Sequence, residues 1–452
     1  MSKTLALTAV LVTVVPMGAG AQDARTVIEN AARTMGTTGL NAITYSGAAA
    51  VANFGQSRTI SFGLASTTIR NYTRTIDFTQ PASHVTGMAA PPAVQGGPPP
   101  GAFEEIVTPA DPASQQLDIW ITPWGFLRGA AANAATVRSQ KIEGTAYKVV
   151  TWSPAQKAPS GRAYRLVGYI NPDNLVDRVE TWSEHPIFGD MHIETFYTNY
   201  QDVSGLKVPG RIAQRRVGME MFVAVIGSVR TNPPDLAQLM TPLPPSAGAA
   251  TALASTVGSE ALAEGVYRIT GDYAALAVEL RDYVVVIGGG GDEARGLATL
   301  AETKRLFPKK PIKYIVNTHP HFDHAAVLPP FAADGITILT DDPNRYFLEQ
   351  ALGSPRTLVG DALAKSRRKP KVESVMEKLV LGDSTRSIEL HHLERFDHSD
   401  GTLIAYLPKE KILFTADVDA AQPASPTAMA LKQNLDRLQL NFDRHVMARE
   451  PK

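Results

Sequence analysis

Cysteine is absent from this 452-residue chain, and charge of neither sign predominates. Without a thiol, the chain can form no disulfide, no thiolate metal site, no cysteine nucleophile and no lipid anchor on an N-terminal cysteine. Its 44 basic residues balance its 44 acidic residues, so no global field favours nucleic acid or an anionic membrane. We therefore expect no nucleic-acid partner.

Long apolar runs are also scarce, and the one notable run lies at the N-terminus. Lys3 gives a positive start, Leu5 to Val15 is apolar, and Ala19-Gly20-Ala21 fits a small-residue cleavage site. The run is too short for a permanent membrane helix. We predict a signal peptide over residues 1–21, a periplasmic or secreted protein that begins near Gln22, and no transmembrane segment in the mature chain. An apolar N-terminal helix of a cytosolic protein is the alternative, which the cleavage site disfavours.

Changes in composition and periodicity divide the rest of the chain into two domains. Residues 22–234 read as one helix followed by strands and turns, including a strand from Leu117 to Thr122, and predict a mostly antiparallel β domain. Residues 235–256 are rich in proline and alanine and predict a linker. In residues 257–452 short apolar strands alternate with helices, which implies sheets covered by helices on their outer faces.

A histidine cluster marks the start of the chemistry, because three of the 10 histidines fall between Asn317 and His324. In an extended segment alternate side chains point the same way, so His319, His321 and Asp323 share a side and His324 leaves at another angle. Imidazole and carboxylate are the metal ligands left to a chain without cysteine. This array can serve two metal ions. A polar loop of solvated histidines is the alternative, and the spacing disfavours it.

Two later residues lie at the ends of predicted strands, where metal ligands are usually presented. His398 directly precedes a predicted strand from Thr402 to Leu407, and Asp417 follows one from Ile412 to Thr415. Either residue alone would be interpreted as part of a surface loop. Their order after the histidine cluster makes them candidate ligands.

This ordered set of residues resembles the metallo-β-lactamase superfamily, over roughly Gly265 to the C-terminus. The resemblance implies an α/β fold class with a four-layer αββα sandwich, which carries metals, usually zinc, at the sheet edges. It also implies the ligand roles. The first metal would be held by His319, His321 and His398, the second by Asp323 and His324, and Asp417 would bridge the two.

The residue types agree with hydrolytic zinc chemistry. Neutral imidazoles and carboxylates suit zinc, which keeps an open position for water in catalytic sites. Zinc lowers the pKa of bound water to roughly 7, so hydroxide is available to attack a carbonyl or phosphoryl centre. Asp323 would orient this nucleophile and pass a proton to the leaving group. We therefore expect a metal-dependent hydrolase whose small-molecule substrate is an ester, lactone, thioester, amide or phosphoester.

The sequence departs from the family pattern at its end. The family's last strand usually ends in a Gly-His-Gly-like turn whose histidine completes the second metal site, and here Arg449 aligns with that histidine. A guanidinium has no lone pair to donate and stays charged. We predict one zinc ion at the first site and a weak or empty second site, with Arg449 paired to Asp323 or Asp417. The alternative is that His445 acts as a substitute ligand.

Two further hypotheses concern function. The first is a non-catalytic binding protein that has the fold but an incomplete second metal site, and Arg449 motivates it. The second is that the N-terminal domain, which faintly resembles periplasmic lipoprotein carriers, binds a lipid or a partner protein. Fold alone does not choose the substrate.

Overall fold

The computed structural model describes residues 18–59, 64–90, 100–243, 256–419 and 425–449. Most of the predicted signal peptide and most of the predicted linker lie outside these ranges. Helix α1 (Gly18–Met35) begins inside the predicted signal peptide and runs past the expected cleavage point. Among the described residues, no helix has both the length and the apolar character needed to cross a bilayer.

The N-terminal domain is built on one antiparallel sheet of eleven strands in the order β4-β3-β2-β1-β11-β10-β9-β8-β7-β6-β5. Two meanders, β1 to β4 and β5 to β11, are joined by the pairing of β1 with β11. The strands are β1 (Ala42–Ala52), β2 (Ser66–Asp77), β3 (Ala82–Ala90), β4 (Gly101–Val107), β5 (Thr136–Ile142), β6 (Thr145–Trp152), β7 (Leu166–Ile170), β8 (Val176–His185), β9 (Gly189–Val203), β10 (Leu206–Arg216) and β11 (Met219–Thr231).

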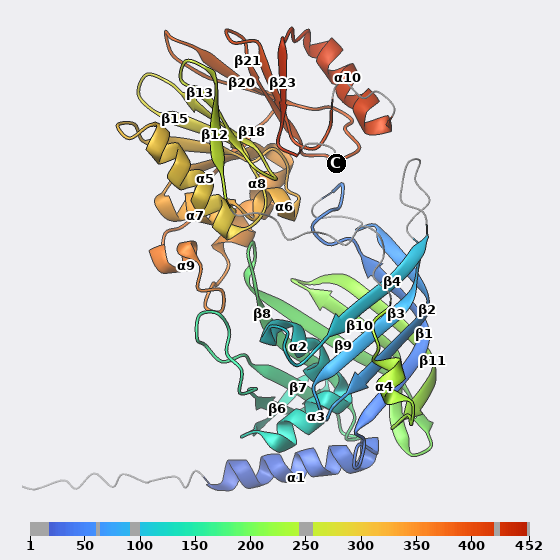
Figure 1. The fold of residues 1–452 in the computed structure, drawn as a ribbon. Coiled ribbons are helices and arrows are strands. Elements are labelled where there is room, and N and C mark those ends of the chain that lie inside the picture. Colours follow the sequence, from blue (N-terminus) through green and yellow to red (C-terminus); the bar gives the residue numbers. More distant parts are fainter. Residues whose placement is uncertain (1–17, 60–63, 91–99, 244–255, 420–424, 450–452) are drawn as a thin grey trace, which may run out of the picture.

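The curved sheet wraps around helices α2 (Ala113–Trp120) and α3 (Pro123–Ala132), as Figure 1 shows. The prediction of a strand from Leu117 to Thr122 is therefore wrong. Leu117 and Ile119 flank the polar Asp118 as in the alternation of a strand, but both are buried on α2. Thr122 caps α3, since its Oγ1 accepts a hydrogen bond from Gly125 N at 3.1 Å, and Pro123 fits the first helical position because no donor is needed there.

The C-terminal domain packs two sheets face to face, and an apolar core that includes Val285, Ile287 and Leu403 fills the space between them. The first sheet has the order β12 (Gly258–Ala263), β13 (Val266–Thr270), β14 (Ala275–Glu279), β15 (Val284–Gly288), β16 (Ile312–Val316), β17 (Thr337–Asp341) and β18 (Val372–Val375). The second has the order β19 (Lys378–Gly382), β20 (Ser387–His392), β21 (Leu403–Leu407), β22 (Ile412–Thr415) and β23 (Arg444–Met447).

Helices cover both outer faces of this pair of sheets (Figure 1). The first sheet carries α5 (Glu293–Leu306), α7 (Leu328–Asp334) and α8 (Asp342–Gly353), and the second carries α10 (Pro426–Leu438). The described part of the chain also contains the short helices α4 (Leu236–Leu239), α6 (Phe322–Ala325) and α9 (Ala362–Ser366). The predicted four-layer αββα sandwich, preceded by a mostly antiparallel β domain, is confirmed.

One buried arginine links the two domains. Arg356, in the loop after α8, pairs with Asp361, and only 6% and 2% of the two side chains are exposed. The same guanidinium donates to the carbonyl of Pro186 at 2.6 Å and to that of Ile187 at 3.0 Å, in the loop between β8 and β9. One arginine therefore satisfies a buried carboxylate and two backbone acceptors of the other domain.

Replacing Arg356 with alanine leaves the Asp361 carboxylate buried without its counter-charge. We expect Arg356→Ala to lower the free energy of unfolding by roughly 3–5 kcal/mol. The matched control is Arg345→Ala, because Arg345 pairs with Glu349 on the exposed surface of α8, where such a pair is worth at most about 1 kcal/mol. Urea denaturation followed by circular dichroism measures both variants, and equal losses would contradict the role assigned to Arg356.

Candidate metal centre

Three chain segments meet at one edge of the sandwich and bring the predicted ligands together. His319 and His321 lie between the end of β16 and the start of α6. His398 lies in the loop between β20 and β21, and Asp417 directly follows β22. Because β22 and the last two residues of β16 are buried, the ends of these strands fix the loops that carry the ligand side chains.

The ligand atoms converge at distances that suit a zinc ion. His398 Nε2 lies 3.3 Å from His319 Nε2 and 3.1 Å from Asp417 Oδ2, and His319 Nε2 lies 3.3 Å from Asp417 Oδ2. Together with one nitrogen of His321, all four ligand atoms lie within 4.8 Å of one another. Tetrahedral zinc with bonds of roughly 2.0–2.1 Å separates its ligand atoms by roughly 3.3 Å. These four residues therefore fit the metal.

The protonation states of these residues also suit metal binding. Burial, together with the neighbouring histidines, lowers the pKa of His319 well below its usual value and that of His321 to about 4. Burial opposes ionisation of Asp417, but His324 and His398 outweigh it and hold the pKa of this carboxyl far below its usual range. Neutral imidazoles and a carboxylate are the forms that a metal requires.

The backbone of the N-terminal domain orients His321. Its Nε2 lies 3.2 Å from the carbonyl oxygen of Ser57, in the loop that follows β1. A carbonyl only accepts, so this contact places the proton on Nε2 and leaves Nδ1 with its lone pair. Partners of this kind fix the tautomer and ring orientation of metal-binding histidines.

Both oxygens of Asp323 are engaged by protein groups. Gln56 Nε2 donates to Oδ1 at 2.7 Å, and the Tyr273 hydroxyl donates to Oδ2 at 2.7 Å. Arg449 Nη1 lies 3.8 Å from the same Oδ2, and its guanidinium lies 5.6 Å from the centre of the Tyr273 ring. Of the two partners predicted for Arg449, the structure places Asp323 beside it.

His324 and His445 differ in where they point. His324 Nε2 lies 3.0 Å from Asp417 Oδ1, and its Nδ1 lies 3.0 Å from the Gly289 carbonyl, so this ring adjoins the four-residue group. His445 lies elsewhere, with Nε2 2.8 Å from Thr415 Oγ1. The structure therefore offers no support for His445 as a substitute ligand.

Residues 53–59, which we call the β1–β2 loop segment, belong to the site although sequence reasoning missed them. Gly55 O accepts from Phe322 N at 2.9 Å, and Arg58 Nε and Thr59 Oγ1 donate to Asp400 at 2.7 and 2.5 Å, close to His398. These partners lie more than 260 residues from the histidine cluster. The local signal is a Gly-containing turn, which indicates a loop but no partner.

Aromatic packing holds the same segment against the metal-binding loop. The Phe54 ring meets Phe322 edge-on at 4.9 Å and stacks on Phe188 at 5.5 Å. His185 joins the cluster, with its ring 5.1 Å from that of Phe322. The residue between the two ligand positions His321 and Asp323 is thus packed against the N-terminal domain.

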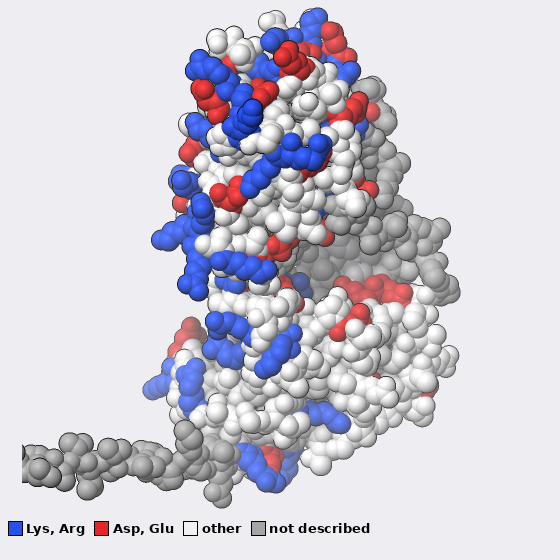
Figure 2. Space-filling model, turned by 60° about the vertical axis from the view of Figure 1, so that its left-hand side comes forward, with Lys and Arg blue, Asp and Glu red and all other residues white. Residues whose placement is uncertain are grey.

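The charged side chains on the surface of the C-terminal domain are of both signs. Figure 2 shows basic and acidic side chains interspersed over the C-terminal domain, whereas most of the N-terminal surface in that view is uncharged.

Comparison with known proteins gives matches for the C-terminal domain. The metallo-beta-lactamase superfamily matches residues 271–425. A metallo-beta-lactamase from Pontibacter korlensis is 18% identical with a TM-score of 0.33, over 43% of this chain and 92% of that one. A metallo-beta-lactamase of Cronobacter sakazakii is 17% identical with a TM-score of 0.32, over 43% and 78% of the two chains. The flavodiiron protein of Giardia intestinalis is 16% identical with a TM-score of 0.32, over 42% and 54%.

No curated protein matches this chain. The family match nevertheless coincides with the sandwich, and the matched range contains every proposed ligand from His319 to Asp417. The C-terminal domain of this chain is therefore a member of the metallo-beta-lactamase superfamily.

Proposed function

We propose that this protein is an exported metal-dependent hydrolase that binds one zinc ion at its histidine cluster. The ligands would be His319, His321, His398 and Asp417. The observation that carries the proposal is the convergence of three ligand atoms at 3.1 to 3.3 Å. Zinc, when bound, supplies a Lewis acid and activates water at neutral pH. Export rests on the predicted signal peptide, and a purified mature chain that begins near Gln22 would support it.

Asp323 is proposed as the catalytic base. Burial opposes its ionisation, but His324, Gln56 and Tyr273 outweigh burial and lower the pKa of this carboxyl. It is therefore ionised at neutral pH. It would accept a proton at Oδ1 or Oδ2 when the hydrogen bond from the Gln56 amide or from the Tyr273 hydroxyl breaks. The substrate would be an ester, lactone, thioester, amide or phosphoester, since each presents a carbonyl or phosphoryl centre to the nucleophile.

The contacts of Asp323 favour a single metal. A second ion would need an oxygen of this carboxylate, and both oxygens already accept short hydrogen bonds. Arg449 adds a fixed positive charge at 3.8 Å, which opposes a second cation. Three groups, Gln56, Tyr273 and Arg449, thus occupy the surroundings that a second metal would use.

Zinc content tests the single-metal site. Protein saturated with zinc and then freed of excess metal is expected to hold one ion per chain by elemental analysis. Arg449→His removes the charge and adds an imidazole, so we expect a second ion to bind in this variant. His445→Ala is the control and keeps one ion, because His445 points toward Thr415. Two ions per wild-type chain would refute the single-metal site.

Hydrolysis tests the role of Asp323. On a panel of esters, lactones, thioesters, amides and phosphoesters, we expect zinc-loaded protein to turn over at least one class. Asp323→Asn should lower kcat at least about 100-fold while the zinc content stays at one ion. Asp397→Asn, an exposed position in the loop that carries His398, should leave kcat unchanged. A full rate in Asp323→Asn would remove this residue from the mechanism.

The second candidate function is a metal-containing binding protein without catalysis. Four protein ligands are typical of closed, structural zinc sites, and Gln56 covers Asp323 from the N-terminal domain. In that case zinc would bind as above, yet none of the substrate classes would be turned over by the wild-type protein.

A further inference from the structure

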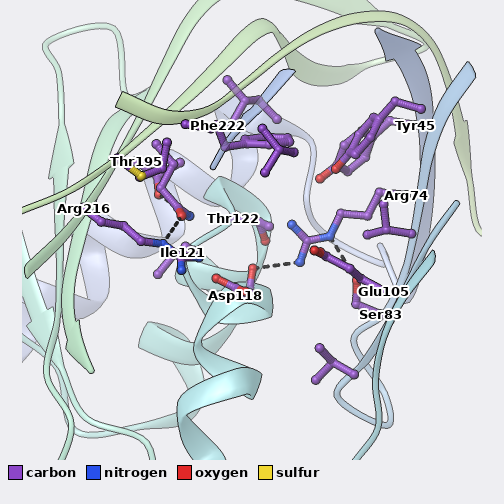
Figure 3. Close-up of a pocket in the computed structure, with 18 of the residues that line it drawn as sticks. Tyr45, Arg74, Ser83, Glu105, Asp118, Ile121, Thr122, Thr195, Arg216 and Phe222 are labelled. Atoms are coloured by element: carbon purple, nitrogen blue, oxygen red, sulfur yellow. Dashed lines mark hydrogen bonds between the residues drawn. The ribbon is translucent and has the colours of Figure 1, made fainter. Parts of the chain in front are cut away.

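A cavity of about 200 Å³ lies inside the N-terminal domain, between the concave face of the sheet and α2 (Figure 3). Its walls come from β1 to β4 and from β9 to β11, and α2 closes it from within the curve. Pockets that hold drug-sized molecules measure roughly 300–1,000 Å³. The cavity is therefore suited to a smaller ligand.

Part of the cavity wall is apolar. Tyr45, Val85, Phe103, Met221 and Phe222 line it. Tyr45 and Val85 are buried, with 2% and 6% of their surface exposed. Such a wall favours an aliphatic or aromatic group on the ligand, since burial of apolar surface is favourable.

Four charged side chains line the same cavity. They are Arg74 on β2, Glu105 on β4, Asp118 on α2 and Arg216 on β10. In Figure 3 the two guanidinium groups come from opposite walls, with Asp118 between them. Among the described residues, no nitrogen of either arginine lies within the 4.0 Å of an ion pair from either carboxylate. All four side chains keep part of their surface in solvent, and Glu105 is exposed, so the charges can be reached by a ligand that enters the cavity.

Neutral groups hold the two arginines in place. Arg216 Nε donates to Gln214 Oε1 at 3.0 Å, and Arg74 donates from Nε to Ser83 Oγ and from Nη2 to the Asp118 carbonyl, each at 3.0 Å. In the part of the chain that is described, the terminal Nη groups of Arg216 meet no acceptor. The Arg216 guanidinium is therefore held in position while its terminal nitrogens can meet a ligand, which is the arrangement of a preorganised site.

We propose that this cavity binds a small zwitterion with an apolar side group, of the α-amino acid type. Its carboxylate would pair with Arg216, its ammonium with Asp118 and Glu105, and its side group would pack against Phe222. A simple anion would leave the two carboxylates facing it, and a simple cation would leave the arginines without a partner. A neutral ligand with both charges matches a lining whose four charges sum to zero.

The cavity also adjoins the metal centre. Val51 and Phe54, at the end of β1 and in the β1–β2 loop segment, line its rim. Phe54 meets Phe322 of the metal-binding loop at 4.9 Å. A ligand in the cavity would therefore contact the same segment that presents Gln56 and Ser57 to the metal centre.

Calorimetric titration of the full chain tests the proposal. The probes are L-phenylalanine, 3-phenylpropanoate, which lacks the ammonium group, and phenethylamine, which lacks the carboxylate. We expect phenylalanine to bind at least about tenfold more tightly than either analogue, because each analogue leaves one charged partner unmatched. No binding of phenylalanine, or equal affinity for all three probes, would overturn the proposal.

Two variants and a matched control assign the contacts. Arg216→Gln should weaken the binding of phenylalanine at least about tenfold and leave the affinity for phenethylamine unchanged. Asp118→Asn should weaken the binding of phenylalanine and leave the affinity for 3-phenylpropanoate unchanged. Each variant thus keeps its affinity for one analogue, which shows that the variant is folded. Arg215→Gln is the control, since Arg215 is exposed and lies over the Phe196 ring at 5.1 Å. Equal losses in Arg215→Gln and Arg216→Gln would also overturn the proposal.

Discussion

The hydrogen bonds from the β1–β2 loop segment to the metal-binding loop are the interactions on which the site depends. The Ser57 carbonyl sets the tautomer of His321, and the Gln56 side chain donates a hydrogen bond to Asp323 Oδ1. Both groups lie in the loop that directly follows β1, a strand held between β2 and β11. A metal site on the C-terminal sandwich is therefore oriented by the fold of the N-terminal sheet. The two domains are one chemical unit, and a change in the packing of β1 would reach the metal ligands directly.

Charge balance explains why Arg449 belongs beside Asp323. In a two-metal centre the second cation neutralises this carboxylate, and here a guanidinium lies 3.8 Å from it. An arginine delivers one fixed positive charge and hydrogen-bond donors but leaves no open coordination position. Tyr273 and Gln56 satisfy the carboxylate further by donating to opposite oxygens. The guanidinium thus supplies positive charge beside Asp323 but no ligand for a metal.

The parts of the structure that follow from local sequence could be predicted. The order of His319, His398 and Asp417 along the chain carried the family resemblance, and that resemblance implied the sandwich. Arg449, at the place of the family's histidine, led to the expectation of a contact with Asp323 or Asp417. The prediction of a strand from Leu117 to Thr122 failed because a short apolar pattern on a buried helix can resemble that of a strand. Tertiary packing decides between helix and strand in such a segment. The β1–β2 loop segment and the cavity charges could not be predicted, since their partners are brought together by strand pairing across hundreds of residues. Alternating patterns along a strand say which face is buried but not which distant loop it meets.

Gly55 shows how closely the two domains must fit. Its φ of 84° lies in the left-handed region, and a Cβ built on it would lie 2.1 Å from the Phe322 ring. Only glycine lets the backbone approach that ring without strain. This approach brings Gln56 and Ser57 within hydrogen-bond distance of Asp323 and His321, while Phe54 on its other side remains at the rim of the cavity. One residue without a side chain therefore lets a single short segment touch both an internal charged cavity and a metal centre, so any ligand that shifts Phe54 must also act on the groups that hold the metal ligands.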